Sequence, residues 1–188
     1  MKRSEINEAV RAARKAFDDA GWTLPPSPRW DVTDFGLGSF REKGLVLVNL
    51  AEEAEYCEKV MFARRDQRTI AHCHRAKKED IIARRGVLKI QLWEGNPAES
   101  PGSGFTVRIN GEKRAVVSGE IVGLKSGERI TIIPGVYHEF WPASDTCIIG
   151  EVSTANDDAH DNFFVDPEVG RFPKIQEDEP ALVRLIGE

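Results

Sequence analysis

The stretch that decides the fold is His72-Cys73-His74-Arg75-Ala76-Lys77-Lys78-Glu79, with six further residues before Gly86. In a β-strand the side chains at positions i and i+2 leave the same face about 6.6 Å apart, so His72 and His74 can face one ion while Cys73 points away. Strict alternation would place Glu79 on the opposite face, but residues 75–78 are polar enough to turn the chain and start a neighbouring strand. We therefore expect His72, His74 and Glu79 to meet at a metal ion.

A second segment, Pro134-Gly135-Val136-Tyr137-His138, follows the apolar run 130–133. A strand that ends in Pro-Gly turns sharply, and that turn can bring His138 to the same ion from a different strand. Three imidazoles and one carboxylate would leave two of the six positions of an octahedral ion open, as catalysis requires. The alternative is that the paired histidines are ordinary surface residues.

The sequence around these segments is typical of a β-rich protein. Between residues 45 and 153, short runs of β-branched and apolar residues alternate with turn signals. The predicted strands cover residues 45–50, 57–63, 69–74, 80–83, 88–93, 105–109, 115–117, 129–133 and 146–152. Asn110-Gly111 favours a tight type I′ hairpin, and residues 97–104 have the composition of a loop. Without intervening helical periodicity, the pattern predicts an antiparallel sandwich or barrel.

The two ends of the chain differ from this middle region. Apolar residues recur at helical spacing over residues 4–20, and Gly21 stands where a helix would end. Residues 23–30 carry three prolines and predict an extended surface connector. After Asp157 the chain becomes acidic and proline-punctuated, which predicts an arm packed on the barrel or on a second subunit. We therefore expect one domain over residues 1–188, with helix and connector at 1–30, barrel at 45–153 and arm at 154–188.

Composition excludes several classes of partner. The formal charge of -5 and a pI near 5.5 argue against nucleic acid. No run approaches the roughly 20 apolar residues that span a bilayer, so we expect no membrane partner. The cysteines, Cys57, Cys73 and Cys147, are odd in number and scattered, which favours reduced thiols and a cytoplasmic location.

Two charged residues interrupt apolar strands. Glu151 lies in Cys147-Ile148-Ile149-Gly150-Glu151-Val152-Ser153, where burying an unpaired charge would cost several kcal/mol. We interpret Glu151 as a general base or acid whose pKa is raised by desolvation; the alternative is an edge residue that faces solvent. Lys59 could hold a hydroxyl or a developing oxyanion, or its stem could run along apolar surface with the ammonium in water.

Residues 66–142 resemble the cupin superfamily, whose first motif has two histidines one residue apart, a glutamate and a closing glycine. Asp66 stands where that motif begins with glycine. In the second motif Gly127, Gly135 and His138 match, whereas the proline is displaced to Pro134 and Pro142 replaces an asparagine. The resemblance implies a jelly-roll β-barrel and a bound metal, but no particular reaction, because this fold hosts oxygenases, isomerases and binding modules.

The chain as a whole resembles the D-lyxose isomerase family. The resemblance lies in Glu58-Lys59, in the segments of His72, His74, Glu79 and His138 already described, in Gly150-Glu151-Val152-Ser153, and in the later residues Asn156-Asp157-Asp158 and Asp161-Asn162. It implies Mn²⁺, with Zn, Fe, Co or Ni as possible substitutes, and a homodimer. It also implies that Lys59, Glu151 and Asp161, together with Glu79, line a site for a monosaccharide substrate. His160, in the same acidic loop, is expected to be exposed.

The implied activity is aldose–ketose isomerisation, between D-lyxose and D-xylulose and also between D-mannose and D-fructose. A divalent ion on O1 and O2 of the open-chain sugar would acidify the C2 proton and stabilise an enediolate. We expect Glu151 to move that proton, because Glu79 has its lone pairs committed to the metal. The sequence favours a free over a phosphorylated sugar only weakly, since Arg64, Arg65 and Arg68 could bind a phosphate group. The alternatives are an iron-dependent cupin dioxygenase, which would not need Glu151, and a non-catalytic sugar-binding cupin.

Overall fold

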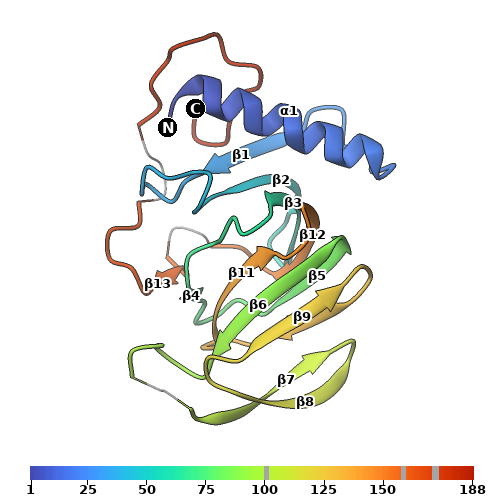
Figure 1. Ribbon diagram of the computed structural model, residues 1–188, viewed down its shortest axis with the longest axis vertical. Coiled ribbons are helices and arrows are strands. Elements are labelled where there is room, and N and C mark those ends of the chain that lie inside the picture. The colour runs from blue at the N-terminus through green and yellow to red at the C-terminus, as the bar shows by residue number, and fades with distance from the viewer. Residues whose placement is uncertain (100–101, 158–159, 171–173) are drawn as a thin grey trace.

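The computed structural model describes residues 1–99, 102–157, 160–170 and 174–188. Its described elements confirm the predicted all-β fold with a helix at the N-terminus (Figure 1). In chain order they are α1 (Arg3–Asp19), β1 (Arg29–Thr33), β2 (Leu45–Glu52), β3 (Tyr56–Arg64), β4 (His72–Cys73), β5 (Glu79–Arg85), β6 (Val87–Trp93), β7 (Gly104–Ile109), β8 (Glu112–Val117), β9 (Ile121–Lys125), β10 (Arg129–Ile132), β11 (Tyr137–Pro142), β12 (Thr146–Thr154) and β13 (Phe163–Phe164).

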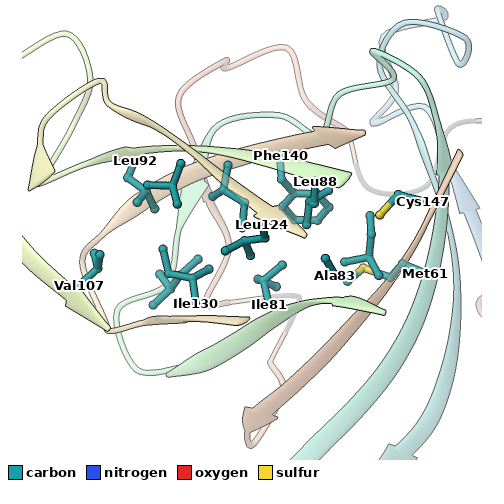
Figure 2. Packing of buried hydrophobic residues seen from close by; sticks show 14 of the residues in the cluster. Met61, Ile81, Ala83, Leu88, Leu92, Val107, Leu124, Ile130, Phe140 and Cys147 are labelled. Atoms are coloured by element: carbon teal, nitrogen blue, oxygen red, sulfur yellow. The ribbon is translucent and has the colours of Figure 1, made fainter. Parts of the chain in front are cut away.

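The strands form two antiparallel sheets that pack face to face. One sheet has the order β1-β2-β3-β12-β5-β10-β7-β8 and the other the order β13-β4-β11-β6-β9. Alternation along β6 is clear, because Leu88, Ile90 and Leu92 are buried while Val87 and Lys89 are exposed. Figure 2 shows Leu88 and Leu92 with residues of the opposite sheet, including Ile81 and Ile130. This is the jelly-roll architecture expected of a cupin.

A second core lies on the outer face of the larger sheet, beneath α1. Val46, Val48, Val60 and Phe62 alternate with the inward residues of β2 and β3 and pack in one cluster with helix residues such as Phe17. Burial of both faces explains why residues 45–48 of β2 and 60–63 of β3 are continuously apolar in sequence.

Three local predictions are confirmed. The helix occupies residues 3–19, and Gly21 follows with φ 68°, in the left-handed region that favours glycine. Asn110 and Gly111 join β7 to β8 with φ of 53° and 85°, as a type I′ hairpin requires.

Other strand predictions were wrong or incomplete. The connector ends within β1, whose Arg29 and Trp30 pair with β2, because its prolines all precede the paired residues. Strands β9, β11 and β13 were not predicted, and β4 is shorter than the strand predicted over residues 69–74. Within the predicted loop at 97–104, residues 100 and 101 lie outside the described part of the chain.

The C-terminal arm packs on the helix as well as on the barrel. Arg3 of α1 forms ion pairs with Glu177 and Glu188, and the Ser4 hydroxyl donates to Asp178 at 2.7 Å. Earlier in the arm, β13 pairs with β4. The arm therefore reaches the strand that carries His72. Among the described residues, no helix is both long and apolar enough to cross a membrane.

Candidate metal centre and active site

The residues predicted to hold a metal come from both sheets. His72 on β4 lies directly opposite His138 on β11 in the smaller sheet. His74 follows β4, and Glu79 is the first residue of β5 in the larger sheet. The turn at residues 75–78 was expected to start a neighbouring strand, but it crosses between the sheets instead. That crossing brings Glu79 back toward the histidines across the barrel interior.

The three histidines form one cluster. Their donor atoms all lie within 4.8 Å of one another, and the ring centroids of His72 and His138 are 4.4 Å apart. Each ring donates its Nδ1–H to a backbone carbonyl: His72 to Ile70 at 2.7 Å, His74 to Asp161 at 2.6 Å and His138 to Val136 at 3.3 Å. These bonds fix the tautomer, so each Nε2 carries a lone pair available to an ion.

Burial keeps two of these imidazoles neutral. The pKa of His72 lies well below its usual value, first because the ring is buried and then because His138 and His74 are close. Burial also lowers the pKa of His74, although Glu79 opposes the shift. Neutral imidazoles are the form that binds a metal.

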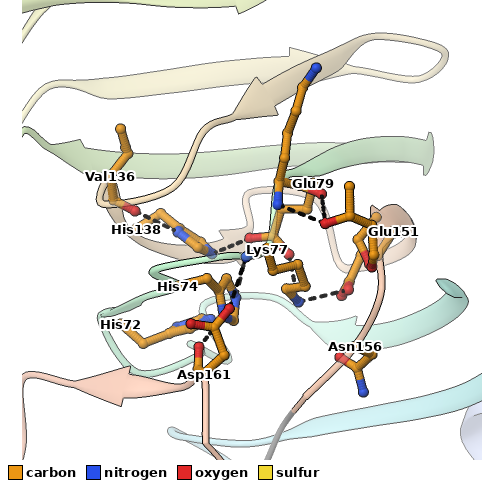
Figure 3. Close-up of polar contacts among 12 residues, drawn as sticks. His72, His74, Lys77, Glu79, Val136, His138, Glu151, Asn156 and Asp161 are labelled. Carbon is orange, nitrogen blue, oxygen red and sulfur yellow. Dashed lines mark hydrogen bonds and ion pairs between the residues drawn. The ribbon is translucent and has the colours of Figure 1, made fainter. Parts of the chain in front are cut away.

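Glu79 lies against the same cluster (Figure 3). Its Oε1 is 2.9 Å from Nε2 of His138 and 3.5 Å from Nε2 of His74. A cation held between Oε1 and these two Nε2 atoms would stabilise all three groups in this arrangement. Within the described part of the chain, neither Nε2 of His74 nor Oε1 of Glu79 has a hydrogen-bond partner. The donor set thus fits a divalent ion, and Glu79 as the fourth ligand remains a prediction.

Lys77 also belongs to the site, although it was not predicted from the sequence. Its Nζ lies 2.9 Å from Oε2 of Glu79 and 3.0 Å from Oε1 of Glu151, and the side chain is buried. Burial disfavours the ammonium, but the two carboxylates raise the pKa of Lys77 above its usual value. A signal was available, since Lys77 precedes Glu79 by two residues and an extended chain directs both to one face.

Glu151 and Lys59 face each other across neighbouring strands. They are paired in register on β12 and β3, with Lys59 Nζ 3.5 Å from Glu151 Oε1. Lys59 also donates to Oδ1 of Asn156 at 3.1 Å. β12 is an inner strand and both side chains are buried. The alternative that Glu151 is an edge residue facing solvent is therefore wrong, and so is the alternative that the Lys59 ammonium lies in water.

The expected direction of the Glu151 pKa shift was wrong. Burial alone would raise this pKa, but the charges of Lys59 and Lys77 outweigh it and hold the pKa below its usual value. Burial similarly opposes ionisation of Glu79, whose pKa is nevertheless well below the usual range, chiefly because of Lys77. The site therefore contains two ionised carboxylates flanked by two lysines.

Asp161 was expected to contact the sugar, but its side chain contacts the backbone of the protein. Its carboxylate accepts from the backbone N–H groups of Arg75, Ala76 and Lys77 at 2.7 to 3.1 Å, and its carbonyl accepts from His74. These are the contacts of a positioning residue, and sugar binding by Asp161 remains a prediction. His160 is 83% exposed, as expected, and contacts Asp157. Asp158 of this acidic cluster lies outside the described residues.

The three histidines, the two lysines and the two glutamates of the site line one cavity of about 100 Å³. Its lining combines the polar cluster with an apolar wall. The lining residues are Phe35, Leu45, Leu47, Lys59, Met61, Thr69, His72, His74, Lys77, Glu79, Ile81, His138, Phe140, Glu151, Asn162 and Phe164.

The three arginines considered for a phosphate do not line this cavity. Instead each forms an ion pair, Arg64 with Glu8, Arg65 with Asp145 and Arg68 with Glu139. This arrangement gives a phosphorylated sugar no support.

Sequence comparisons relate the chain to known proteins. The family model described as D-lyxose isomerase matches residues 27–188. A D-lyxose/D-mannose isomerase of Escherichia coli O157:H7 is 36% identical over 223 aligned positions, which cover 100% of this chain and 98% of the relative. A D-lyxose ketol-isomerase of Cohnella laeviribosi is 34% identical, covering 95% of this chain and all of the relative.

Solved structures agree on the fold. L-ribose isomerase of Acinetobacter sp. DL28, in complex with L-ribose, superposes with a TM-score of 0.70 at 16% identity, covering 94% of this chain and 98% of that one. The ligand-free L-ribose isomerase of Cellulomonas parahominis gives the same TM-score at 18% identity, covering 93% and 98%. At these identities the likeness shows the fold alone.

Proposed function

Because this chain belongs to the D-lyxose isomerase family, we propose that it is a metal-dependent aldose–ketose isomerase that interconverts D-lyxose with D-xylulose, and D-mannose with D-fructose. The single observation that carries the proposal is the position of Glu151. Its ionised carboxylate shares one cavity with three imidazoles whose Nε2 atoms are free to bind an ion. A base beside a Lewis-acid site is what proton transfer between adjacent carbons requires.

We propose that His72, His74, His138 and Glu79 hold one divalent ion, Mn²⁺, although the same donors also accept Zn, Fe, Co or Ni. When bound, the ion would polarise the sugar oxygens and make the proton on C2 more acidic. Carbonyl acceptors on all three Nδ1 atoms orient the imidazoles toward the ion's position.

Glu151 is the proposed base. Lys59 and Lys77 keep its carboxylate ionised, so it can accept the C2 proton and return it to C1 of the resulting enediol. Glu79 is the poorer candidate, because its two oxygens already face Lys77 on one side and the imidazoles on the other. Lys59 stands within 3.5 Å of the base and could donate to a sugar oxygen that gains negative charge.

The assembly and location of the protein belong to the same proposal. We propose a single cupin domain over residues 1–188, a homodimer and a cytoplasmic enzyme with no nucleic-acid partner. Sedimentation of the purified protein would test the dimer. The buried free thiols Cys57, Cys73 and Cys147 are compatible with a reducing compartment.

The experiment is incubation of Mn²⁺-reconstituted protein with a panel of free aldoses in deuterated water without oxygen. We expect ketose formation from D-lyxose and D-mannose, with deuterium at C2 or C1. Sugar binding without turnover in any divalent metal would contradict the proposal and favour a binding protein. Oxygen consumption with Fe²⁺, and no ketose, would favour a dioxygenase.

A further inference from the structure

Phe35 has a backbone conformation that bulky side chains rarely adopt. Its φ is 56°, in the left-handed region where the Cβ atom is crowded against the backbone. Such a conformation persists only where surrounding contacts impose it, and it is concentrated at functional sites. Phe35 also lines the cavity of the candidate site. The contacts that hold it therefore bear on what its ring does there.

The turn around Phe35 is fixed by side-chain hydrogen bonds from the preceding residues. Phe35 donates its N–H to Oγ1 of Thr33 at 2.9 Å. The buried carboxylate of Asp34 accepts from the N–H groups of Gly36 at 2.9 Å and Gly38 at 3.2 Å. These bonds satisfy the backbone in the strained turn and hold the ring of Phe35 in one direction.

The C-terminal arm holds the same turn from the other side. The carbonyl of Phe35 accepts from the N–H of Gly170 at 2.8 Å. The approach is so close that a Cβ atom on Gly36 would lie 3.0 Å from the backbone of Gly170. Contacts from two distant parts of the sequence thus impose the position of Phe35.

The ring of Phe35 continues toward the metal site through Phe164. The two rings meet edge to face with centroids 6.2 Å apart, and the Phe164 centroid lies 5.4 Å from that of His72. This edge-to-face arrangement is a favourable aromatic contact. All three rings line the cavity, so the aromatic pair forms a wall that begins at a proposed metal ligand.

The floor of the cavity holds buried charges among buried apolar residues, and its mouth holds half-buried aromatic rings beside Asn162 and His72. Lys77, Glu79 and Glu151 are almost fully buried, whereas Phe35 and Phe164 are half-buried. If C1 and C2 of a sugar meet Glu151 at the floor, the opposite end of the open chain must extend toward the mouth. There the rings of Phe35 and Phe164 restrict its length and do not hydrogen-bond to its hydroxyls.

We propose that Phe35 is a specificity-determining residue whose ring, together with Phe164, limits the length of the sugar chain and favours five-carbon over six-carbon aldoses. The inference rests on the proposed isomerase function and deepens it. The strained turn has the role of directing the ring into the cavity.

The test compares Phe35→Gly with the unaltered protein on D-lyxose and D-mannose. Glycine accepts φ 56° without strain, so this variant removes the ring and retains the turn. We expect kcat/KM for D-mannose relative to D-lyxose to rise about 10- to 100-fold, the range for one extra carbon in an apolar site. Phe35→Tyr keeps the ring and should keep the ratio within about twofold. Phe105→Ala, which removes another half-buried ring outside this cavity, should also leave the ratio within about twofold.

A second measurement separates this inference from the proposed function. Titration calorimetry of the Mn²⁺-loaded proteins with D-arabinitol and D-mannitol, the reduced forms of the two sugars, measures size preference without turnover. If the protein isomerises neither sugar but loses its five-carbon preference on Phe35→Gly, the isomerase proposal fails and the wall remains. A folded Phe35→Gly variant with an unchanged ratio in both assays would overturn the inference, as would failure of the unaltered protein to bind either alditol.

Discussion

The Nζ atom of Lys77 lies 3.0 Å from Oε1 of Glu151, and both side chains are more than nine-tenths buried. The same ammonium contacts Glu79, so one lysine compensates the proposed base and a proposed metal ligand at once. Lys59 contacts Glu151 from the neighbouring strand. The buried charges are therefore mutually dependent.

Replacing Lys77 with methionine should destabilise the fold. The apolar stem is retained, but two buried carboxylates lose their shared cation, which typically costs about 3–5 kcal/mol. Urea denaturation would measure the loss. The matched control is Lys78→Met, because Lys78 is exposed and its replacement should stay within about 0.5 kcal/mol. Equal effects of the two substitutions would show that the Lys77 ammonium compensates nothing.

Glu151→Gln should abolish proton transfer while leaving the ion bound. The amide is nearly isosteric but cannot accept the C2 proton, so kcat should fall by about 10²- to 10⁴-fold. Metal content measured by mass spectrometry should not change, because Glu151 is not among the proposed ligands. Glu58→Gln, next to Lys59 on the same strand but outside the cavity lining, is the control. Full activity of Glu151→Gln would assign the base elsewhere.

The histidine cluster could be predicted from sequence because few residue types bind ions and their spacing is strict. His72 and His74 had to share a strand face, and only the turn before Glu79 needed a separate argument. The wrong strand predictions have a different origin. β11 was missed because Pro134-Gly135 was interpreted only as the end of a strand. The pair does follow β10, but it also precedes β11, which pairs with both β4 and β6.

Lys77 and the pKa of Glu151 could not be found in the same way. The two-residue spacing from Lys77 to Glu79 suggests a shared face, but nothing local shows that the run 75–78 has the geometry that keeps Lys77 on that face, because the turn is held by Asp161, 84 residues after Lys77. The pKa of Glu151 then depends on Lys77, so an argument from burial alone gave the wrong direction. Long-range contacts decide both properties, and a local pattern does not contain them.

Metal removal should destabilise the protein as well as inactivate it. An ion that binds the folded state at about 100 times its Kd adds about 2.7 kcal/mol, so Mn²⁺ should raise the Tm of chelator-treated protein by about 5–10 °C. In His138→Ala the shift should disappear. The exposed His160 offers the control His160→Ala, which should keep the full shift. A Tm independent of every divalent metal would contradict the site.

Gly86, the closing glycine of the first motif, should tolerate no side chain. Its φ is 95°, and an added Cβ would lie 2.6 Å from the carbonyl oxygen of Thr146. Gly86→Ala should therefore cost about 2–4 kcal/mol in denaturation experiments. At Gly127 an added Cβ contacts nothing, so Gly127→Ala adds only the backbone strain of φ 92° and should cost about 1–2 kcal/mol. Gly123→Ala adds neither a steric contact nor a positive φ and should be nearly neutral. Any other order of the three would refute the steric argument.

Asp161→Asn distinguishes a positioning role from sugar binding. The Asp161 carboxylate accepts from three backbone amides of the turn that follows His74, and an amide side chain can replace only part of this. The turn would loosen His74 and Lys77 together, so the Kd for Mn²⁺ should rise about 10- to 100-fold. At saturating metal, KM for D-lyxose should then change little. A raised KM with unchanged metal affinity would instead place Asp161 on the sugar, as the family resemblance implied, and Asp157→Asn, an exposed carboxylate in the same loop, should alter neither quantity.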